Sequence, residues 1–117
     1  HYHQNGKELS NSNRLAFVID FIKHNFHQKL STSLLSQKAC MSESHFYRVF
    51  KNELGSSPTE YINTIRVNEA AKMLSDVKRS ISDVYLCCGF ESRSYFNRVF
   101  KRIKGLSPSL YQNRFRH

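Results

Sequence analysis

Two short stretches of the chain place hydroxyls, amides and cations at spacings that suit contact with the edges of nucleic-acid bases. The first stretch spans residues 44–51, and the second spans residues 94–101, 50 positions later. In both stretches an arginine follows a serine by four residues, so the two side chains share one face of a helix. Arginine can bind guanine bidentately, and asparagine can pair with adenine. The candidates for base contact are Ser44, His45, Tyr47, Arg48, Arg93, Ser94, Asn97 and Arg98.

Other cations in and just after these stretches suit phosphate better than bases. A flexible ammonium, or a guanidinium at the edge of the surface, positions a protein on the nucleic-acid backbone without reading its sequence. For Arg48 and Arg98 phosphate contact remains an alternative to base contact, and for every outward residue a merely solvated side chain is the competing interpretation. The phosphate candidates are Lys51, Lys101 and Arg102.

The two stretches belong to a longer internal repeat. Between residues 42–66 and 92–116, 13 of 25 positions are identical. A match of that density at a fixed period indicates one structural unit used twice. In each copy, apolar residues at i, i+3 and i+4 form one helical stripe, which predicts a helix with its stripe in the core and its polar candidates outside. The stripe residues are Phe46, Val49 and Phe50 in the first copy and Phe96, Val99 and Phe100 in the second.

Local start and stop signals predict seven helices and no long strand. In each copy a serine caps a short helix, a second serine caps the longer helix, a glycine ends it, and Ser-Pro opens the next helix. Tight turns are expected at Cys40–Met41 and Gly89–Phe90. The capping, ending and opening residues are Ser31, Ser42, Gly55, Ser57 and Pro58, and then Ser80, Ser92, Gly105, Ser107 and Pro108.

The predicted fold is therefore all-α, with seven helices in two helix-turn-helix subdomains joined by a long central helix. Ser12 or Asn13 is expected to cap the first helix. In the last helix Leu110, Tyr111 and Phe115 are expected to face inward. The predicted parts are a polar linker end at 1–11, a first subdomain at 12–57, a connecting helix at 58–75 and a second subdomain at 76–117.

The charge of the chain is compatible with a polyanionic partner. The formal net charge is +9, of which residues 76–117 carry nine Lys/Arg against three Asp/Glu, or +6, and residues 1–75 carry the other +3. Such a balance suits nucleic acid or an anionic membrane surface, although an ordinary soluble basic surface explains the charge equally well. No apolar run approaches the roughly 20 residues that a membrane-spanning helix needs.

Cysteine and histidine, which often form metal sites and active sites, are present, but their spacing does not match a known site of either kind. Cys40, Cys87 and Cys88 form no CxxC pair, so we expect buried small hydrophobes in a reducing compartment. His24 and His27 lie near a helix end, where cationic histidines are favoured, and this explanation is preferred over a metal pair. No catalytic triad order, paired carboxylates or glycine-rich phosphate loop occurs. We therefore expect no catalytic residues, no metal, no cofactor and no enzymatic activity.

The pattern resembles the DNA-binding domain of the AraC/XylS family of bacterial transcription regulators, and the resemblance covers residues 12–117. It implies sequence-specific binding to double-stranded DNA, with two recognition helices in successive major-groove segments. It also implies activation of transcription through RNA polymerase, a cytoplasmic, nucleoid-associated location and no membrane partner. The matching residues are Ile81-Ser82-Asp83-Val84, Gly89-Phe90, Ser94-Tyr95-Phe96, Arg98-Val99-Phe100-Lys101, Gly105, Ser107-Pro108, Tyr111 and Arg114.

The resemblance also bears on what precedes the chain. The chain begins at His1 without a methionine, so we expect an excised fragment whose N-terminal sensing or dimerisation domain lies before His1.

The alternative function is a basic helical adaptor module that binds a protein or an acidic surface. The repeated outward serine and arginine favour DNA, because an adaptor has no need for the same pair twice in equivalent positions.

Overall fold

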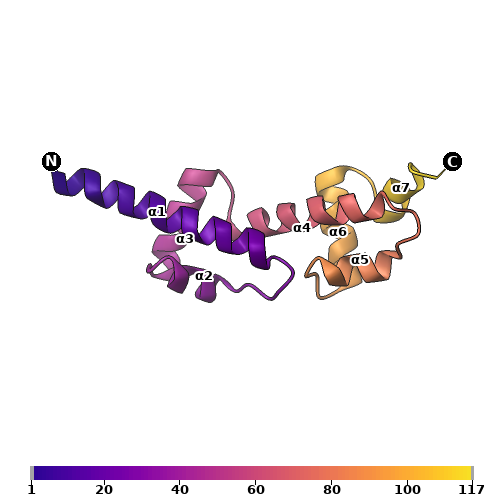
Figure 1. The fold of residues 1–117 in the computed structure, drawn as a ribbon, viewed down its shortest axis with the longest axis horizontal. Coiled ribbons are helices and arrows are strands. Elements are labelled where there is room, and N and C mark those ends of the chain that lie inside the picture. Colours follow the sequence, from indigo (N-terminus) through magenta and orange to yellow (C-terminus); the bar gives the residue numbers. More distant parts are fainter. Residues whose placement is uncertain (1, 117) are drawn as a thin grey trace. The chain divides into compact units, whose positions relative to one another are not determined.

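The computed structural model describes the backbone of residues 2–116 and the side chains of residues 11–116. Within that range the chain is all-α with seven helices and no strand, as the sequence predicts (Figure 1). No helix in the described range is long and apolar enough to cross a membrane. The helices are α1 (Tyr2–Asn25), α2 (Thr32–Lys38), α3 (Glu43–Leu54), α4 (Pro58–Leu74), α5 (Ile81–Cys87), α6 (Arg93–Lys104) and α7 (Pro108–Asn113).

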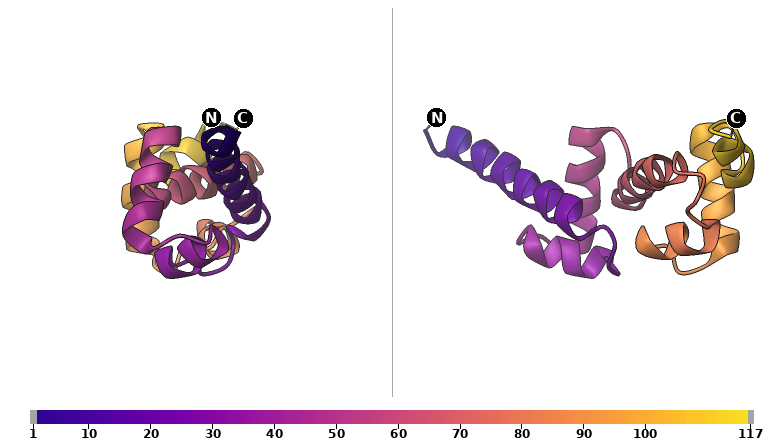
Figure 2. Two further views of the ribbon diagram at one scale, coloured as in Figure 1. Left: turned by 90° about the vertical axis from the view of Figure 1, so that its left-hand side faces the viewer. Right: turned by 45° about the vertical axis from the view of Figure 1, so that its right-hand side comes forward.

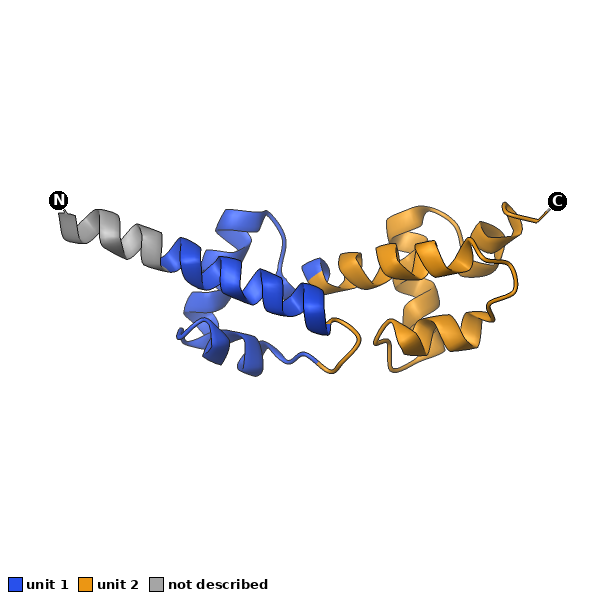
Figure 3. Cartoon of the chain, viewed as in Figure 1, with its two compact units in different colours: residues 1–25, 30–61 blue, residues 26–29, 62–117 orange. Residues whose placement is uncertain are grey.

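The chain divides into two compact units, which are coloured separately in Figure 3. Unit 1 comprises residues 1–25 and 30–61, and unit 2 comprises residues 26–29 and 62–117. In unit 1, α2 packs against both α1 and α3; in unit 2, α6 packs against both α5 and α7 (Figure 2). Each unit thus contains one short helix followed by a longer one, which is the predicted helix-turn-helix order.

The predicted caps form as expected. The backbone N–H three residues after each capping serine donates to the serine Oγ at 3.0–3.2 Å, which satisfies an amide that the helix itself leaves unpaired. Gly55 and Gly105 end α3 and α6 in the left-handed conformation, with φ of 79° and 81°. Glycine pays no Cβ penalty in this conformation, so it is the usual residue after a helix.

The first helix differs from the prediction at its start. The sequence places a cap at Ser12 or Asn13, whereas α1 begins at Tyr2, so both residues lie inside the helix with exposed side chains. Polar residues suit a helix that faces solvent, and no proline interrupts residues 2–25, so the change in polarity does not end the helix. The expected linker end at 1–11 falls almost wholly on residues whose side chains lie outside the described part.

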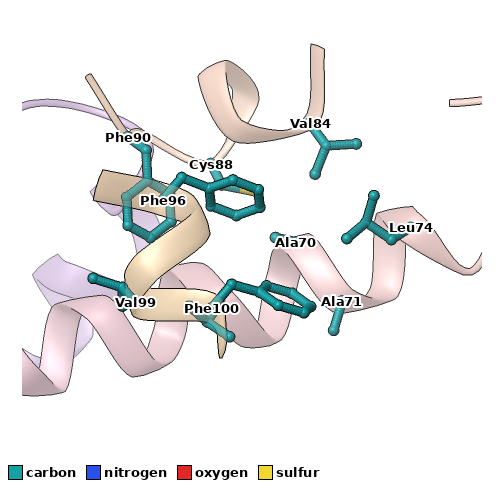
Figure 4. Packing of buried hydrophobic residues seen from close by; sticks show 10 residues of the cluster. Ala70, Ala71, Leu74, Val84, Cys88, Phe90, Phe96, Val99 and Phe100 are labelled. Atoms are coloured by element: carbon teal, nitrogen blue, oxygen red, sulfur yellow. The ribbon is translucent and has the colours of Figure 1, made fainter. Parts of the chain in front are cut away.

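The apolar stripe of α6 forms the centre of the core of unit 2 (Figure 4). Phe96 and Phe100 are fully buried with ring centroids 5.6 Å apart, and Phe90 from the turn lies 5.0 Å from Phe96. In unit 1, Phe46 and Phe50 of α3 are likewise fully buried. The prediction that the stripe faces the core is therefore confirmed for the phenylalanines and for Val99, whereas Val49 is half-buried. The remaining core of unit 2 is Val67, Ala70, Ala71, Leu74, Val84, Cys88 and Val99.

The last helix packs in a different register from the predicted one. Leu110 and Phe115 are 57% and 37% exposed, whereas Tyr111 is half-buried and packs edge-on against Phe100. Pro108 and Gln112 are buried, because positions i, i+3 and i+4 from residue 108 share one helix face. Position 110 points to the opposite face, and position 115 lies beyond the end of the helix at Asn113, where the helical register no longer applies.

The expectation of three buried cysteines is wrong for two of them. Cys40 and Cys87 are exposed, and only Cys88 is buried. Cys40 occupies the turn between α2 and α3 with φ of 56°, and Cys87 is the last residue of α5 on its outer side. Burial raises the pKa of the Cys88 thiol from 9.0 to about 11.

Candidate nucleic-acid interface

The two helix-turn-helix turns share one pattern of backbone hydrogen bonds. In unit 1 the N–H of Cys40 donates to the Gln37 carbonyl at 3.0 Å, and in unit 2 the N–H of Gly89 donates to the Leu86 carbonyl at 3.1 Å. The residue after each turn donates to the carbonyl five positions earlier, again at 3.0 and 3.1 Å. Both turn residues have positive φ, with Gly89 at 92°. These matched bonds fix each longer helix on its shorter partner.

All eleven predicted contact residues lie on α3 or α6, and all are exposed on the side of the helix away from the buried stripe. Their exposure follows from the 3.6-residue period, which puts the aromatic stripe inward and leaves the intervening positions in solvent. Their contact with bases or phosphates stays a prediction. The residues are Ser44, His45, Tyr47, Arg48 and Lys51 on α3, and Arg93, Ser94, Asn97, Arg98, Lys101 and Arg102 on α6.

Arg93, the first residue of α6, is linked to the short helix of its unit. Its Nη1 donates to the Oγ of Ser82 on α5 at 3.2 Å. The residue at the equivalent position of α3 is Glu43, which has the opposite charge. The first turns of the two candidate reading helices therefore present different chemistry to a ligand.

Arg98 lies against an aromatic ring of its own helix. Its guanidinium carbon is 5.4 Å from the centroid of the Tyr95 ring, within the range of a cation–π contact. The Tyr95 hydroxyl in turn accepts a hydrogen bond from Nδ2 of Asn63 at 2.8 Å. In α3, Lys51 lies 6.0 Å from the ring of Tyr47, at the outer limit of such a contact.

The loop of residues 26–29, which belongs to unit 2, is held there by an arginine of α4. Arg66 of α4 donates from Nε to the Phe26 carbonyl and from Nη2 to the Gln28 carbonyl, each at 2.8 Å. Its guanidinium also lies 5.9 Å from the Phe90 ring. Desolvation by the surrounding residues lowers the pKa of Arg66 from its ordinary value. These contacts hold the loop beside the turn that precedes α6.

Comparisons with known proteins agree with this geometry. A family model described as "Helix-turn-helix domain" matches residues 35–114, which include both turns and both candidate reading helices. The DNA-binding domain of AdpA, a global transcriptional factor solved in complex with a target DNA, is 31% identical. Its TM-score is 0.82, and the match covers 87% of this chain and 92% of that one. The chain belongs to the AraC family of helix-turn-helix DNA-binding domains.

Two further matches are a solved structure with the same fold and a bacterial relative in sequence. An AraC-type transcriptional regulator from Chromobacterium violaceum shares the fold, with a TM-score of 0.79, 24% identity and coverage of 91% of this chain and 95% of that one. An uncharacterised HTH-type transcriptional regulator of Staphylococcus aureus (strain MSSA476) is 35% identical over 91 residues. That match covers 78% of this chain and 12% of the relative, so the domain corresponds to a small part of the relative's length. The family consists of transcription regulators and not of enzymes.

The two candidate reading helices of this AraC-family domain differ strongly in charge. The sequence of α6 contains five cations and no acid, whereas α3 balances Arg48 and Lys51 against Glu43 and Glu53. Lys104, in the last turn of α6, is an exposed cation that sequence reasoning did not select. In the side chains that the structure describes, no group of three His, Cys, Asp or Glu residues is placed to hold a metal ion.

Sequence reasoning also missed the residues that contact the candidate arginines Arg93 and Arg98 or hold their neighbours in place. Ser82 and Tyr95 belong to the family signature and Asn63 recurs in the repeat as Asn113, but no spacing rule connects any of them to an arginine. Asn63 and Tyr95 are 32 positions apart, and Ser82 and Arg93 are 11 apart. Their recurrence or motif membership was the only available signal.

Proposed function

We propose that this AraC-family domain binds double-stranded DNA sequence-specifically, with α3 and α6 each reading a major-groove segment, and that the two segments follow one another on the duplex. The observation that carries the proposal is the repeated arrangement of one exposed serine, arginine and lysine set over one buried aromatic stripe. An α-helix with donors along its outer face fits the width of the major groove. The matched turns then support both helices in the same way.

The recognised site should be asymmetric. The base candidates of α3 include His45 and Tyr47, whereas the equivalent positions of α6 carry Tyr95 and Asn97, and α6 adds Arg93. Two different sets of side chains select two different base sequences. The repeat relates the units in the same chain direction, so we expect two unlike boxes in direct orientation and not a palindrome.

In its parent protein the domain would act as the effector end of a transcription regulator, working at the nucleoid. We propose that it activates transcription by contact with RNA polymerase and that a sensing or dimerisation domain precedes it in the parent chain. The similarity to proteins named as transcriptional regulators, of which this domain matches only a small part, supports this role. Transcription in vitro from a promoter with the selected site, with and without the parent protein, tests the direction of regulation.

Selection of bound sequences from a random duplex pool tests the main proposal. We expect two short conserved boxes to emerge, and a gel shift with one selected duplex to show tighter binding than a scrambled duplex of the same composition. A Lys72→Gln variant serves as control, because Lys72 is exposed on α4, pairs with Glu69 and is not among the contact candidates. No enrichment, together with no binding to any duplex at low salt, would instead favour the basic adaptor module.

A further inference from the structure

The contact between Tyr95 and Arg98 leaves the binding edge of the arginine available. The two residues lie three positions apart on α6, and both are exposed. A cation 5.4 Å from a ring centroid is attracted to the ring as a whole, whereas a bidentate pair needs the N–H donors at the edge of the guanidinium. Arg98 can therefore keep its ring contact while its donors form a bidentate pair with a guanine.

Tyr95 is itself fixed at both ends by buried groups. Its hydroxyl accepts from Asn63, whose side chain is only 4% exposed on α4, and its ring contacts Phe90 with centroids 6.1 Å apart. Phe90 is 3% exposed. A buried amide donor without an acceptor is destabilising, so we expect the Asn63–Tyr95 hydrogen bond to persist in the protein without DNA. Tyr95 thus presents an exposed ring face whose position the core determines.

Unit 1 has no counterpart to this arrangement. The equivalent positions carry His45 in place of Tyr95 and Arg48 in place of Arg98. Across the part of the chain whose side chains are described, neither the His45 ring nor the Arg48 guanidinium has a hydrogen bond or a ring contact. The restraint is therefore specific to α6 and is not a general property of the repeat.

We propose that Tyr95, anchored by Asn63, is a positioning residue that holds Arg98 ready for base contact and so sets the base preference of the segment read by α6. The inference rests on the proposed function. An arginine side chain that is unrestrained in the unbound protein must lose conformational entropy when it binds a base. This loss reduces the affinity for every DNA sequence whose recognition requires that arginine. A guanidinium already held over Tyr95 loses less, and it is also less able to shift toward a wrong base.

A double-mutant cycle on the full chain tests whether Tyr95 acts through Arg98. The variants are Tyr95→Leu, Arg98→Met and the two combined, measured by competition with duplexes that carry each single-base change in the selected site. We expect Tyr95→Leu to reduce discrimination about 3- to 10-fold at the base that depends on Arg98, and to have no further effect in the Arg98→Met background. The salt dependence of Tyr95→Leu should match that of the parent, because Tyr95 carries no charge.

Two more variants separate positioning from folding. Tyr95→Phe keeps the ring and loses only the hydroxyl, so its effect should be smaller than that of Tyr95→Leu. Phe17→Leu removes an aromatic side chain that is 55% exposed on α1 and should leave base discrimination unchanged. Should Tyr95→Leu fail to fold, the comparison of Tyr95→Phe with the parent in both Arg98 backgrounds decides the question.

Two results would overturn the inference while leaving the proposed function intact. One is a Tyr95→Leu variant that folds and discriminates like the parent. The other is an effect of Tyr95→Leu that adds in full to that of Arg98→Met, which would show that Tyr95 contacts DNA on its own account. A parent chain that selects no sequence at all would remove the proposed function and the inference together.

Discussion

A Cβ atom at Gly89 would lie 2.5 Å from the carbonyl oxygen of Phe26 and 3.0 Å from Nε of Arg66. The Phe26 carbonyl is part of the backbone, and Nε of Arg66 is held in place by its hydrogen bond to that same carbonyl. Neither group can move aside easily. Gly89 also has φ of 92°, a conformation that residues with a side chain rarely adopt. The glycine of this turn is therefore required by the close approach of the 26–29 loop as well as by its own backbone angle.

We expect Gly89→Ala to lower the stability of unit 2. The loss should be larger than the loss from a glycine-to-alanine change at a position where a Cβ atom would meet no neighbour. Strain at a left-handed position costs about 1–3 kcal/mol, and the clash with the Phe26 carbonyl adds to it. Gly55→Ala is the matched control, since Gly55 has φ of 79° with nothing within 4 Å of its Cβ position. Urea unfolding followed by circular dichroism measures both. Equal losses of stability for the two variants would show that the 26–29 loop moves to make room for the added methyl group.

Replacing Phe100 with alanine should unfold unit 2. Removing a fully buried phenylalanine costs about 3–5 kcal/mol, which is a large share of the stability of a small domain. Leu110→Ala serves as control and should change stability by less than about 0.5 kcal/mol, because Leu110 is exposed on α7. A Phe100→Ala protein that melts like the parent but no longer binds DNA would place this ring in the groove and contradict the assigned stripe.

The stability of the domain should fall as the pH rises through the window between 9 and 11 because of Cys88. The folded state holds the thiol proton up to a pKa of about 11, whereas the unfolded chain releases it near 9.0. The unfolded state therefore binds fewer protons in this window, and stability declines by up to about 1.4 kcal/mol per pH unit. The full contribution is present below pH 9.

Cys88→Ala isolates this effect from other groups that titrate at high pH. The equivalent residue in unit 1 is Ala39, which is also fully buried, so the substitution has a precedent within the same chain. Denaturant midpoints measured from pH 8 to pH 10.5 should fall less steeply for the variant than for the parent. Parallel curves would indicate that the Cys88 thiol titrates normally.

Arg93→Ala should weaken recognition in only one of the two boxes. If Arg93 reads a base, its loss relaxes preference at one position by about 1–3 kcal/mol and leaves the other box unchanged. Ser82→Ala removes only the hydrogen bond to Nη1 and should have a smaller effect at the same position. Competition with single-base variants of the selected site measures both. A uniform loss of affinity for all sequences would assign Arg93 to phosphate.

The salt dependence of DNA binding should come mainly from α6. Each lost phosphate contact lowers the slope of log affinity against log salt by about 0.9, so replacing Lys101, Arg102 and Lys104 with glutamine should lower it by up to roughly 2.7. Lys51→Gln in α3 should lower it by about 0.9 at most. Gel shifts over a series of salt concentrations give the slopes. An unchanged slope in the triple variant would exclude these cations from phosphate contact.

The sequence by itself determined the helix count, the serine caps, the left-handed glycines and the buried stripes. Each of these depends on interactions within about one helical turn, such as the bond from the Tyr95 amide to Ser92 or the spacing of Phe96 and Phe100. Such interactions are visible in a short window of residues. The internal repeat then confirmed each signal a second time.

Only the tertiary structure decided which side chains contact the base-contact candidates and which apolar residues remain exposed. Asn63 meets Tyr95 across 32 positions, and Arg66 meets Phe26 across 40, so neither pair has a local signature. Leu110 is exposed because α7 docks through Pro108, Tyr111 and Gln112, and Gln112 is held by carbonyls more than 30 positions earlier. Packing between distant segments selects the register of a short helix, and hydrophobicity alone does not.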